Sequence, residues 1–240
     1  MKTKLRDIAI YQAESPEQRE RLFRFRYQVY VEEMGRSQRY ADQERKRIEE
    51  PFDATAANFI AVAGDEIVGC VRWNSGLDTD FAEYVDLYDM RRAGPYFPHH
   101  CGTTTKLMVA PTYRRTALVV LLCRTLYAYG RSRGVLADFM DCNSHLEGQF
   151  ARFGYRPYRS RVIHPEYGNV LPMLLVCTDL DHLAAVGSPL AIIESHHPRR
   201  PDVTAYFHNH FFNAHRINGY DPSNTFAHAR RRSLSAFITR

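Results

Sequence analysis

The sequence lacks several features that would define a membrane or secreted protein. No apolar run approaches the ~20 residues that a membrane-spanning helix needs. The first residues, MKTKLRDIAIYQ, lack the apolar stretch of a secretory signal, so we expect a cytoplasmic protein. The five cysteines are dispersed and form no CxxC pair, which argues against a disulfide framework or a cysteine-based zinc site. We also expect no metal at the dispersed histidines of the tail, which are His196, His197, His208, His210 and His215.

Positive charge is the first feature that is present. The 240 residues carry a formal net charge of +5, with arginines spread along the chain. Such a balance suits nucleic acid, an anionic membrane surface or an acidic protein partner. No helix has the clustered pattern of a base-reading motif, so we expect no nucleic acid. Peripheral membrane contact and the oligomeric state stay open, and Arg124, Arg131 and Arg133 are interpreted as a solvated helix face.

Apolar periodicity predicts helices interleaved with strands, and hence an α/β fold in which helices cover a sheet. A capping box at Ser15 and Gln18, with Pro16 at the first helical position, predicts a helix that runs to Met34. The charged segment 36–50 is expected to form an exposed flap. The remaining predicted elements are strands at 8–11, 103–109, 135–141 and 173–178, a hairpin at 58–73, and helices at 81–87, 118–134 and 144–153.

The amino-acid composition of the sequence changes near Pro198. Residues 1–197 are predicted to form one domain, whereas residues 198–240 are rich in His, Arg and aromatic residues without a period. This extension is expected to pack on the core or to join another subunit.

The stretch from Lys106 to Tyr158 is the most informative part of the chain. It contains a strand that ends in VAP, a turn, an amphipathic helix, a strand that ends near Asn143, and a helix that closes in FGY. This order resembles the core of the GNAT superfamily of acyltransferases. The resemblance implies a central mixed β-sheet with splayed parallel strands flanked by helices. It also implies that the pantetheine arm of a thioester donor binds along residues Leu107, Met108, Val109, Arg114, Arg115, Asn143 and Phe150.

Two departures from the superfamily pattern bear on the donor. The glycine positions of the phosphate-binding turn hold Ala117 and Val119, and a Cβ there keeps a diphosphate from the backbone. Phe150 stands where many acetyltransferases carry a tyrosine acid. We therefore expect an acyl-phosphopantetheine thioester on acyl carrier protein as the donor, with acyl-CoA as the alternative.

The amino-terminal half resembles the acyl-homoserine-lactone synthases. The segments RYQVYVEEMG, EPFD and GCVRW follow the order of that family's RxxVF helix, DxxD pair and GCxR strand. Arg36 and Thr103 depart from that family, which has a tryptophan and a glutamate there. The element HPEYGNVLPMLLVCTDL instead resembles the related N-acyl amino acid synthases. Together the resemblances imply a catalytic set of Arg26, Glu50, Asp53, Arg72, Thr103 and Lys106.

The predicted reaction is transfer of a long acyl chain from acyl carrier protein to the amine of an amino acid, in a bacterial enzyme. Asp53 or Glu50 is the expected base, although both residues equally suit a structural ion-pair cluster with the arginines. Thr103 and Lys106 can line one site only if a bulge interrupts their strand. The alternatives are a lactone synthase that uses S-adenosylmethionine, an acyl-CoA-dependent GNAT acetyltransferase, and a non-catalytic GNAT-like binding module.

Overall fold

The computed structural model describes residues 7–213, which divide into two compact units. Unit 1 contains residues 7–74 and 104–126, and unit 2 contains residues 75–103 and 127–213. Strand β6 (Cys101–Val109) and helix α3 (Leu118–Ser132) each contribute residues to both units.

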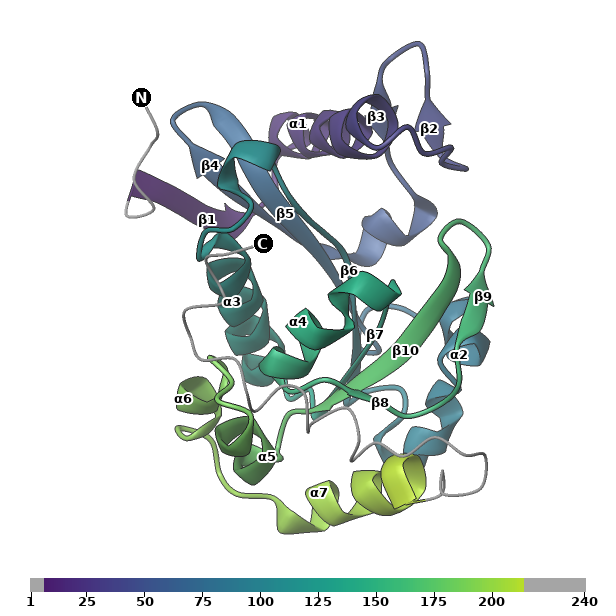
Figure 1. Cartoon of the computed structure of the whole chain (residues 1–240), viewed down its shortest axis with the longest axis vertical. Helices are drawn as coiled ribbons and strands as arrows, with labels where there is room; N and C mark the ends of the chain where they lie inside the picture. The colour runs from purple at the N-terminus through teal and green to yellow at the C-terminus, as the bar shows by residue number, and fades with distance from the viewer. Residues whose placement is uncertain (1–6, 214–240) are drawn as a thin grey trace. The chain divides into compact units, whose positions relative to one another are not determined.

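Unit 1 is built on the antiparallel strands of one sheet, in the order β1, β4, β5 and the carboxyl-terminal part of β6 (Figure 1). Strand β4 pairs with β1 on one side and with β5 on the other. The unit's elements are β1 (Ile8–Gln12), α1 (Pro16–Tyr27), the π-helix η2 (Gln28–Glu33), β2 (Ala41–Asp42), β3 (Arg47–Ile48), the 3-10 turn η3 (Pro51–Thr55), β4 (Ala57–Ala63), β5 (Glu66–Ser75), the 3-10 turn η5 (Pro111–Tyr113) and the first turns of α3.

Unit 2 contains the strand order β6, β7, β10 and β8, with β9 on the other part of β10. Strand β7 pairs in parallel with β6 over Cys101–Thr103 and Ala137–Phe139. The unit's elements are α2 (Tyr84–Leu87), η4 (Met90–Tyr96), β7 (Ala137–Cys142), η6 (Ser144–Leu146), α4 (Glu147–Phe153), β8 (Arg156–Pro157), β9 (Val162–His164), β10 (Gly168–Val176), α5 (Leu180–Ala185), α6 (Ala191–Glu194), α7 (Pro201–Phe207) and η7 (His208–Phe212). A mostly antiparallel sheet with one parallel pair and flanking helices confirms the predicted fold class.

Helix α1 begins as its sequence predicts. The Ser15 hydroxyl accepts a hydrogen bond from Gln18 N at 3.2 Å, and Gln18 Oε1 accepts one from Ser15 N at 3.1 Å. The helix continues into η2, where the backbone bonds widen to the π type, as in Met34 N to Val29 O at 3.1 Å. Leu22 and Phe25 pack into the apolar core of unit 1 against β4 and β5 residues such as Ile60.

The core of unit 2 is aromatic. Phe139 on β7 contacts Tyr158 and Phe211 edge to face, with ring centroids 5.9 and 5.8 Å apart. Phe207 and Phe211, both from the carboxyl-terminal helices, are fully buried. The part of the predicted extension that the structure describes therefore packs on this core, while residues 214–240, including His215, lie outside the described residues.

Two predictions about charged segments are wrong. The segment 36–50 is only partly exposed: it forms the β2–β3 hairpin and buries Gln38, Ile48 and Glu50. Arg131 does not belong to a solvated helix face: its guanidinium is buried and forms a two-point ion pair with Glu194, with Nε–Oε2 at 2.7 Å and Nη2–Oε1 at 3.1 Å. Within residues 7–213 no helix is long and apolar enough to cross a membrane.

Candidate active site

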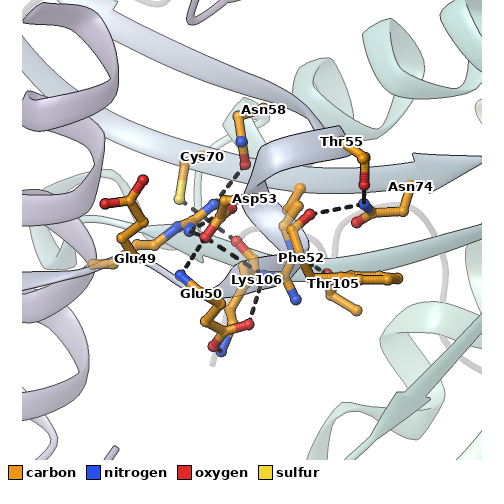
Figure 2. A network of polar contacts seen from close by, with 12 residues as sticks. Glu49, Glu50, Phe52, Asp53, Thr55, Asn58, Cys70, Asn74, Thr105 and Lys106 are labelled. Carbon is orange, nitrogen blue, oxygen red and sulfur yellow. Dashed lines mark hydrogen bonds and ion pairs between the residues drawn. The ribbon is translucent and has the colours of Figure 1, made fainter. Parts of the chain in front are cut away.

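Five charged side chains meet in the interior of unit 1, and we call them the charge cluster: Arg26, Glu50, Asp53, Arg72 and Lys106. They come from four elements: α1 supplies Arg26, the η3 turn and its N-cap supply the two carboxylates, and β5 and β6 supply the last two. Glu50 is the extended N-cap residue of η3 and Asp53 is its third residue, and Asp53 Oδ2 accepts from Glu50 N at 2.8 Å. Figure 2 shows both acids together with Lys106.

Asp53 is the most enclosed acid of the charge cluster. Both of its oxygens accept from Arg26 Nη1 at 2.8 Å, and Oδ2 also accepts from the backbone N of Glu50 at 2.8 Å. Arg72 Nη1 lies 3.6 Å from the same oxygen. Asp53 is 2% exposed and Arg26 is fully buried. Such a carboxylate is fixed in place by its donors.

Glu50 links the two remaining cations. Its Oε2 accepts from Arg72 Nη1 at 2.5 Å, and its Oε1 forms an ion pair with Lys106 Nζ. Arg72 Nε also donates to Thr105 Oγ1 at 2.9 Å. The Lys106 ammonium lies over the ring of Tyr30, 5.2 Å from its centroid, so η2 contributes an aromatic face to the site.

The electrostatics of the charge cluster keep both acids ionised. Burial raises the pKa of Asp53, but the guanidinium groups of Arg26 and Arg72 outweigh it, and the pKa lies below its ordinary value. Burial likewise raises the pKa of Glu50, and Arg72 and then Lys106 outweigh it, so that this pKa is also lowered. At neutral pH both carboxylates of the charge cluster are therefore ionised.

Lys106 interrupts the extended conformation of β6. Its φ is +53°, a left-handed value that a residue with a Cβ rarely adopts inside a strand. This conformation costs a residue of order 1–3 kcal/mol, and residues that adopt it cluster at functional sites. The left-handed residue breaks the regular extended conformation of β6, and the Lys106 side chain meets Glu50 in the interior of unit 1, whereas Thr103 lies in unit 2.

The glycine of the GCVR segment is explained by close packing in unit 1. A Cβ on Gly69 would lie 3.0 Å from Leu122 Cδ1 and 3.2 Å from the Met108 carbonyl oxygen. The missing side chain lets β5 approach both β6 and α3. The next strand residue, Cys70, is fully buried and directs its thiol at the Lys106 carbonyl, 3.5 Å away.

Sequence reasoning missed three polar residues of the site. Asn58 Oδ1 accepts from Arg26 Nη2 at 2.6 Å, Thr105 accepts from Arg72, and Asn74 lies two residues after Arg72 on β5. Both asparagines are fully buried in strands, where asparagine is disfavoured. The sequence signal that could have identified the two asparagines is an asparagine inside an otherwise apolar strand.

The predicted donor-binding residues are divided between the two units. In unit 1, Leu107–Val109 end β6, and the Arg114 guanidinium binds the Glu33 carboxylate, with Nη2–Oε2 at 2.8 Å, so it is engaged by η2. Arg115 is exposed and has a φ of +65°. The turn therefore contains an arginine in the left-handed conformation, which glycine adopts more readily than a residue with a Cβ.

Three further predicted residues lie in unit 2. Thr103 is fully buried, and its Oγ1 has no hydrogen-bond partner. Asn143 occupies the N-cap position of η6 after the end of β7. Phe150 is buried against Tyr155, with ring centroids 6.1 Å apart.

A cavity of about 690 Å³ lies elsewhere in unit 1, between η2, the β4–β5 turn and the segment after β6. Its apolar lining includes Phe25, Val29, Val68 and Tyr113, and no member of the charge cluster borders it. Its volume is typical of small-molecule sites. Among residues 7–213 no group of three or more His, Cys, Asp or Glu side chains is arranged to hold a metal ion.

Comparisons with known proteins agree with this fold. Residues 25–124 match the family model of the acetyltransferase (GNAT) domain. The solved structure of FeeM, an N-acyl amino acid synthase from uncultured soil microbes, is similar at 10% identity and a TM-score of 0.58, covering 75% of this chain and 97% of that one. No curated protein sequence matches the chain.

Two acyl-homoserine lactone synthases described as CoA-dependent have the same fold. MesI is 20% identical with a TM-score of 0.56, and the alignment covers 78% of this chain and 95% of that chain. BjaI, solved with SAM and isopentyl-CoA, is 16% identical with a TM-score of 0.58, covering 83% and 97%. The predicted resemblance is thereby confirmed: the chain has the fold of these synthases, and its residues 25–124 match an acetyltransferase (GNAT) domain, which supports an N-acyltransferase enzyme.

Proposed function

We propose that the protein transfers a long acyl chain from the phosphopantetheine thioester of an acyl carrier protein to the amine of an amino acid. The amine nitrogen attacks the thioester carbonyl, the carbon–sulfur bond breaks, and a free thiol leaves. The amine gives up one proton to a base, and the thiolate takes up a proton. The product is an N-acyl amino acid.

The observation that carries this proposal is that the charge cluster brings together, in the interior of unit 1, five of the six residues that the resemblance names as catalytic. Guanidinium and ammonium groups are the side chains that bind a carboxylate most strongly. An amino acid carries that carboxylate one carbon away from the amine to be acylated.

The two acids have different parts in the proposal. Asp53 is enclosed by Arg26 and the Glu50 backbone, so we assign it the positioning of the cations. Glu50 is more exposed, at 8%, and bridges Arg72 and Lys106. We assign Glu50 the role of base, acting through a water because its lowered pKa keeps it ionised but only weakly basic.

The phosphate turn is the argument for a carrier-protein donor. Ala117 and Val119 carry Cβ atoms where a diphosphate would need close backbone approach, whereas phosphopantetheine on a carrier has a single phosphate. The backbone N–H groups of Leu107–Val109 are proposed to bind the donor arm and the developing oxyanion, with Arg115 at the phosphate, while Asn143 and Phe150 of unit 2 stay predictions from the resemblance. MesI and BjaI are described as CoA-dependent, so the donor must be tested directly.

The second candidate is an acyl-homoserine-lactone synthase. S-adenosylmethionine also presents a carboxylate next to an amine, so the same cations would suit it, and lactone synthases share this fold. Thr103 stands where that family has a glutamate, which favours the amino acid.

The test compares donors and acceptors with one acyl chain. Initial rates of thiol release are measured with a long acyl chain on acyl carrier protein and on CoA, each with a panel of amino acids or with S-adenosylmethionine. We expect release that requires an amino acid and a kcat/KM at least about tenfold higher for the carrier protein. Equal or faster reaction with CoA would overturn the donor assignment, and reaction with S-adenosylmethionine alone would establish the lactone synthase.

A further inference from the structure

The guanidinium of Arg114, at the end of the η5 turn, is held by two elements of unit 1. Its Nη1 donates to Glu33 Oε1 and its Nη2 donates to Glu33 Oε2, the second at 2.8 Å. Its Nε donates to the Val109 carbonyl oxygen at 3.0 Å, at the end of β6. A guanidinium binds a phosphate at two points by presenting the two N–H groups of one edge. Because one edge binds Glu33 and the other is engaged at Nε, Arg114 has no complete edge left for a phosphate.

The ion pair between Glu33 and Arg114 lies at the surface of unit 1. The Arg114 side chain is 45% exposed and the Glu33 side chain 30%. A pair with this exposure contributes little to folding, so its partners can be changed without unfolding the protein. Glu33, the last residue of η2, brings to Arg114 the negative charge that a phosphate would otherwise bring. The carboxylate therefore occupies an anion-binding arginine of the turn.

With Arg114 engaged, the turn presents Arg115 to a phosphate, and this next residue is exposed. The two possible donors differ in the charge that they bring. Phosphopantetheine on a carrier protein is a phosphodiester with a single negative charge, whereas CoA carries a diphosphate and a further phosphate monoester. One arginine suits the phosphodiester. The second phosphate of CoA would need Arg114 and would meet the Glu33 carboxylate, a like charge that repels it.

We propose that Glu33 is a specificity-determining residue for the acyl donor, which acts through Arg114 against donors that carry a diphosphate. The inference rests on the proposed function for the place of the donor phosphate, and it adds a residue outside the turn. Glu33 is a positioning residue, because it holds a guanidinium and touches no reacting atom. Without its carboxylate, Arg114 becomes available as a second cation and the repulsion disappears.

The binding test uses pyrophosphate as the probe and calorimetry on the full chain, so it does not depend on turnover. Glu33→Gln keeps the size of the side chain and removes its charge. The matched control is Glu32→Gln, which makes the same change on the neighbouring exposed residue of η2, whose partner is Lys46 at 3.0 Å. We expect Glu33→Gln to bind pyrophosphate about three- to tenfold more tightly than wild type, and Glu32→Gln to stay within about twofold.

A double variant shows whether the gain in affinity passes through Arg114. Glu33→Gln combined with Arg114→Gln removes both partners, so its affinity for pyrophosphate should return to within about twofold of wild type. Equal binding by wild type and Glu33→Gln, including no binding by either, would overturn the inference. An equal gain in Glu32→Gln, or a gain that persists in the double variant, would overturn it too, because net charge alone would then explain the effect.

The kinetic test compares one acyl chain on CoA and on the carrier protein. We expect Glu33→Gln to raise the ratio of kcat/KM for CoA to that for the carrier by about three- to tenfold, through a lower KM for acyl-CoA at unchanged kcat and amino acid KM. A change confined to kcat would overturn the inference. If wild type already prefers CoA and Glu33→Gln still binds pyrophosphate more tightly, the carrier-protein assignment fails and the role of Glu33 stands. If wild type prefers the carrier and the variant leaves that preference unchanged, the inference fails and the proposed function stands.

Discussion

Replacing Asp53 with asparagine is the perturbation that tests the charge cluster as a structural unit. Asp53 and Arg26 are 2% and 0% exposed and are joined at 2.8 Å through both carboxylate oxygens. Asparagine has the same shape, but it turns an amide N–H toward a guanidinium and leaves the buried Arg26 without its carboxylate. Removing one partner of a buried pair costs about 3–5 kcal/mol.

Urea denaturation followed by circular dichroism measures this cost. With an m-value of about 2 kcal/mol/M, a loss of about 4 kcal/mol shifts the midpoint by roughly 2 M. The double variant Asp53→Asn with Arg26→Met removes the orphaned cation too, so it should lose at least about 1 kcal/mol less than the sum of the two single variants.

The stability of the same variant at low pH provides a second measurement. Because the pKa of Asp53 is lower in the folded protein than its ordinary 3.8, its stabilisation is complete above that value and is lost as the pH falls through the folded pKa. In Asp53→Asn, this part of the loss of folding stability at falling pH should be absent. A midpoint shift below about 0.5 M, or an unchanged acid profile, would refute the ion-pair reasoning.

Three further predictions concern other charged groups. Arg131→Met should destabilise the fold by about 3 kcal/mol in urea, because it leaves the buried Glu194 carboxylate without its guanidinium; a loss below 1 kcal/mol would contradict this. Arg114→Ala should change stability by less than about 1 kcal/mol, because its ion pair with Glu33 is partly exposed, whereas Arg115→Ala should raise the KM of the carrier-protein donor, because Arg115 is the residue proposed at the phosphate. Burial and then Arg156 lower the pKa of His182 to about 4, below its ordinary 6.5, so wild-type stability should fall between pH 6.5 and 4; a His182→Phe variant that retains this slope would refute the assignment.

The sequence predicts elements where local signals are strong. The capping box at Ser15, the apolar strands of the hairpin and the amphipathic helix after Pro111 are all found close to their predicted limits. These features depend on neighbours in the chain, which is why periodicity and turn residues suffice. The two-residue strands β2, β3 and β8 escape prediction because long-range pairing, with little local preference, creates them.

The candidate site is predicted as a list of residues but not as a structure. Family resemblance picks out Arg26, Asp53, Arg72 and their partners, and the structure brings five of the six predicted catalytic residues into contact in unit 1. The inward position of Lys106 goes with its left-handed φ of +53°, and the spacing of residues in the sequence does not predict this conformation for a lysine. The catalytic roles of these residues, and the domain boundary near residue 197, stay predictions.

The most direct test of the central claim is the mass of the product. The full chain is incubated with a long-chain acyl carrier protein thioester, a mixture of amino acids and S-adenosylmethionine, and the extract is analysed by mass spectrometry. We expect a species with the mass of an amino acid plus the corresponding fatty acid less one water, absent without enzyme or without amino acid. An acyl-homoserine lactone as the main product, or intact thioester with every acceptor, would contradict it.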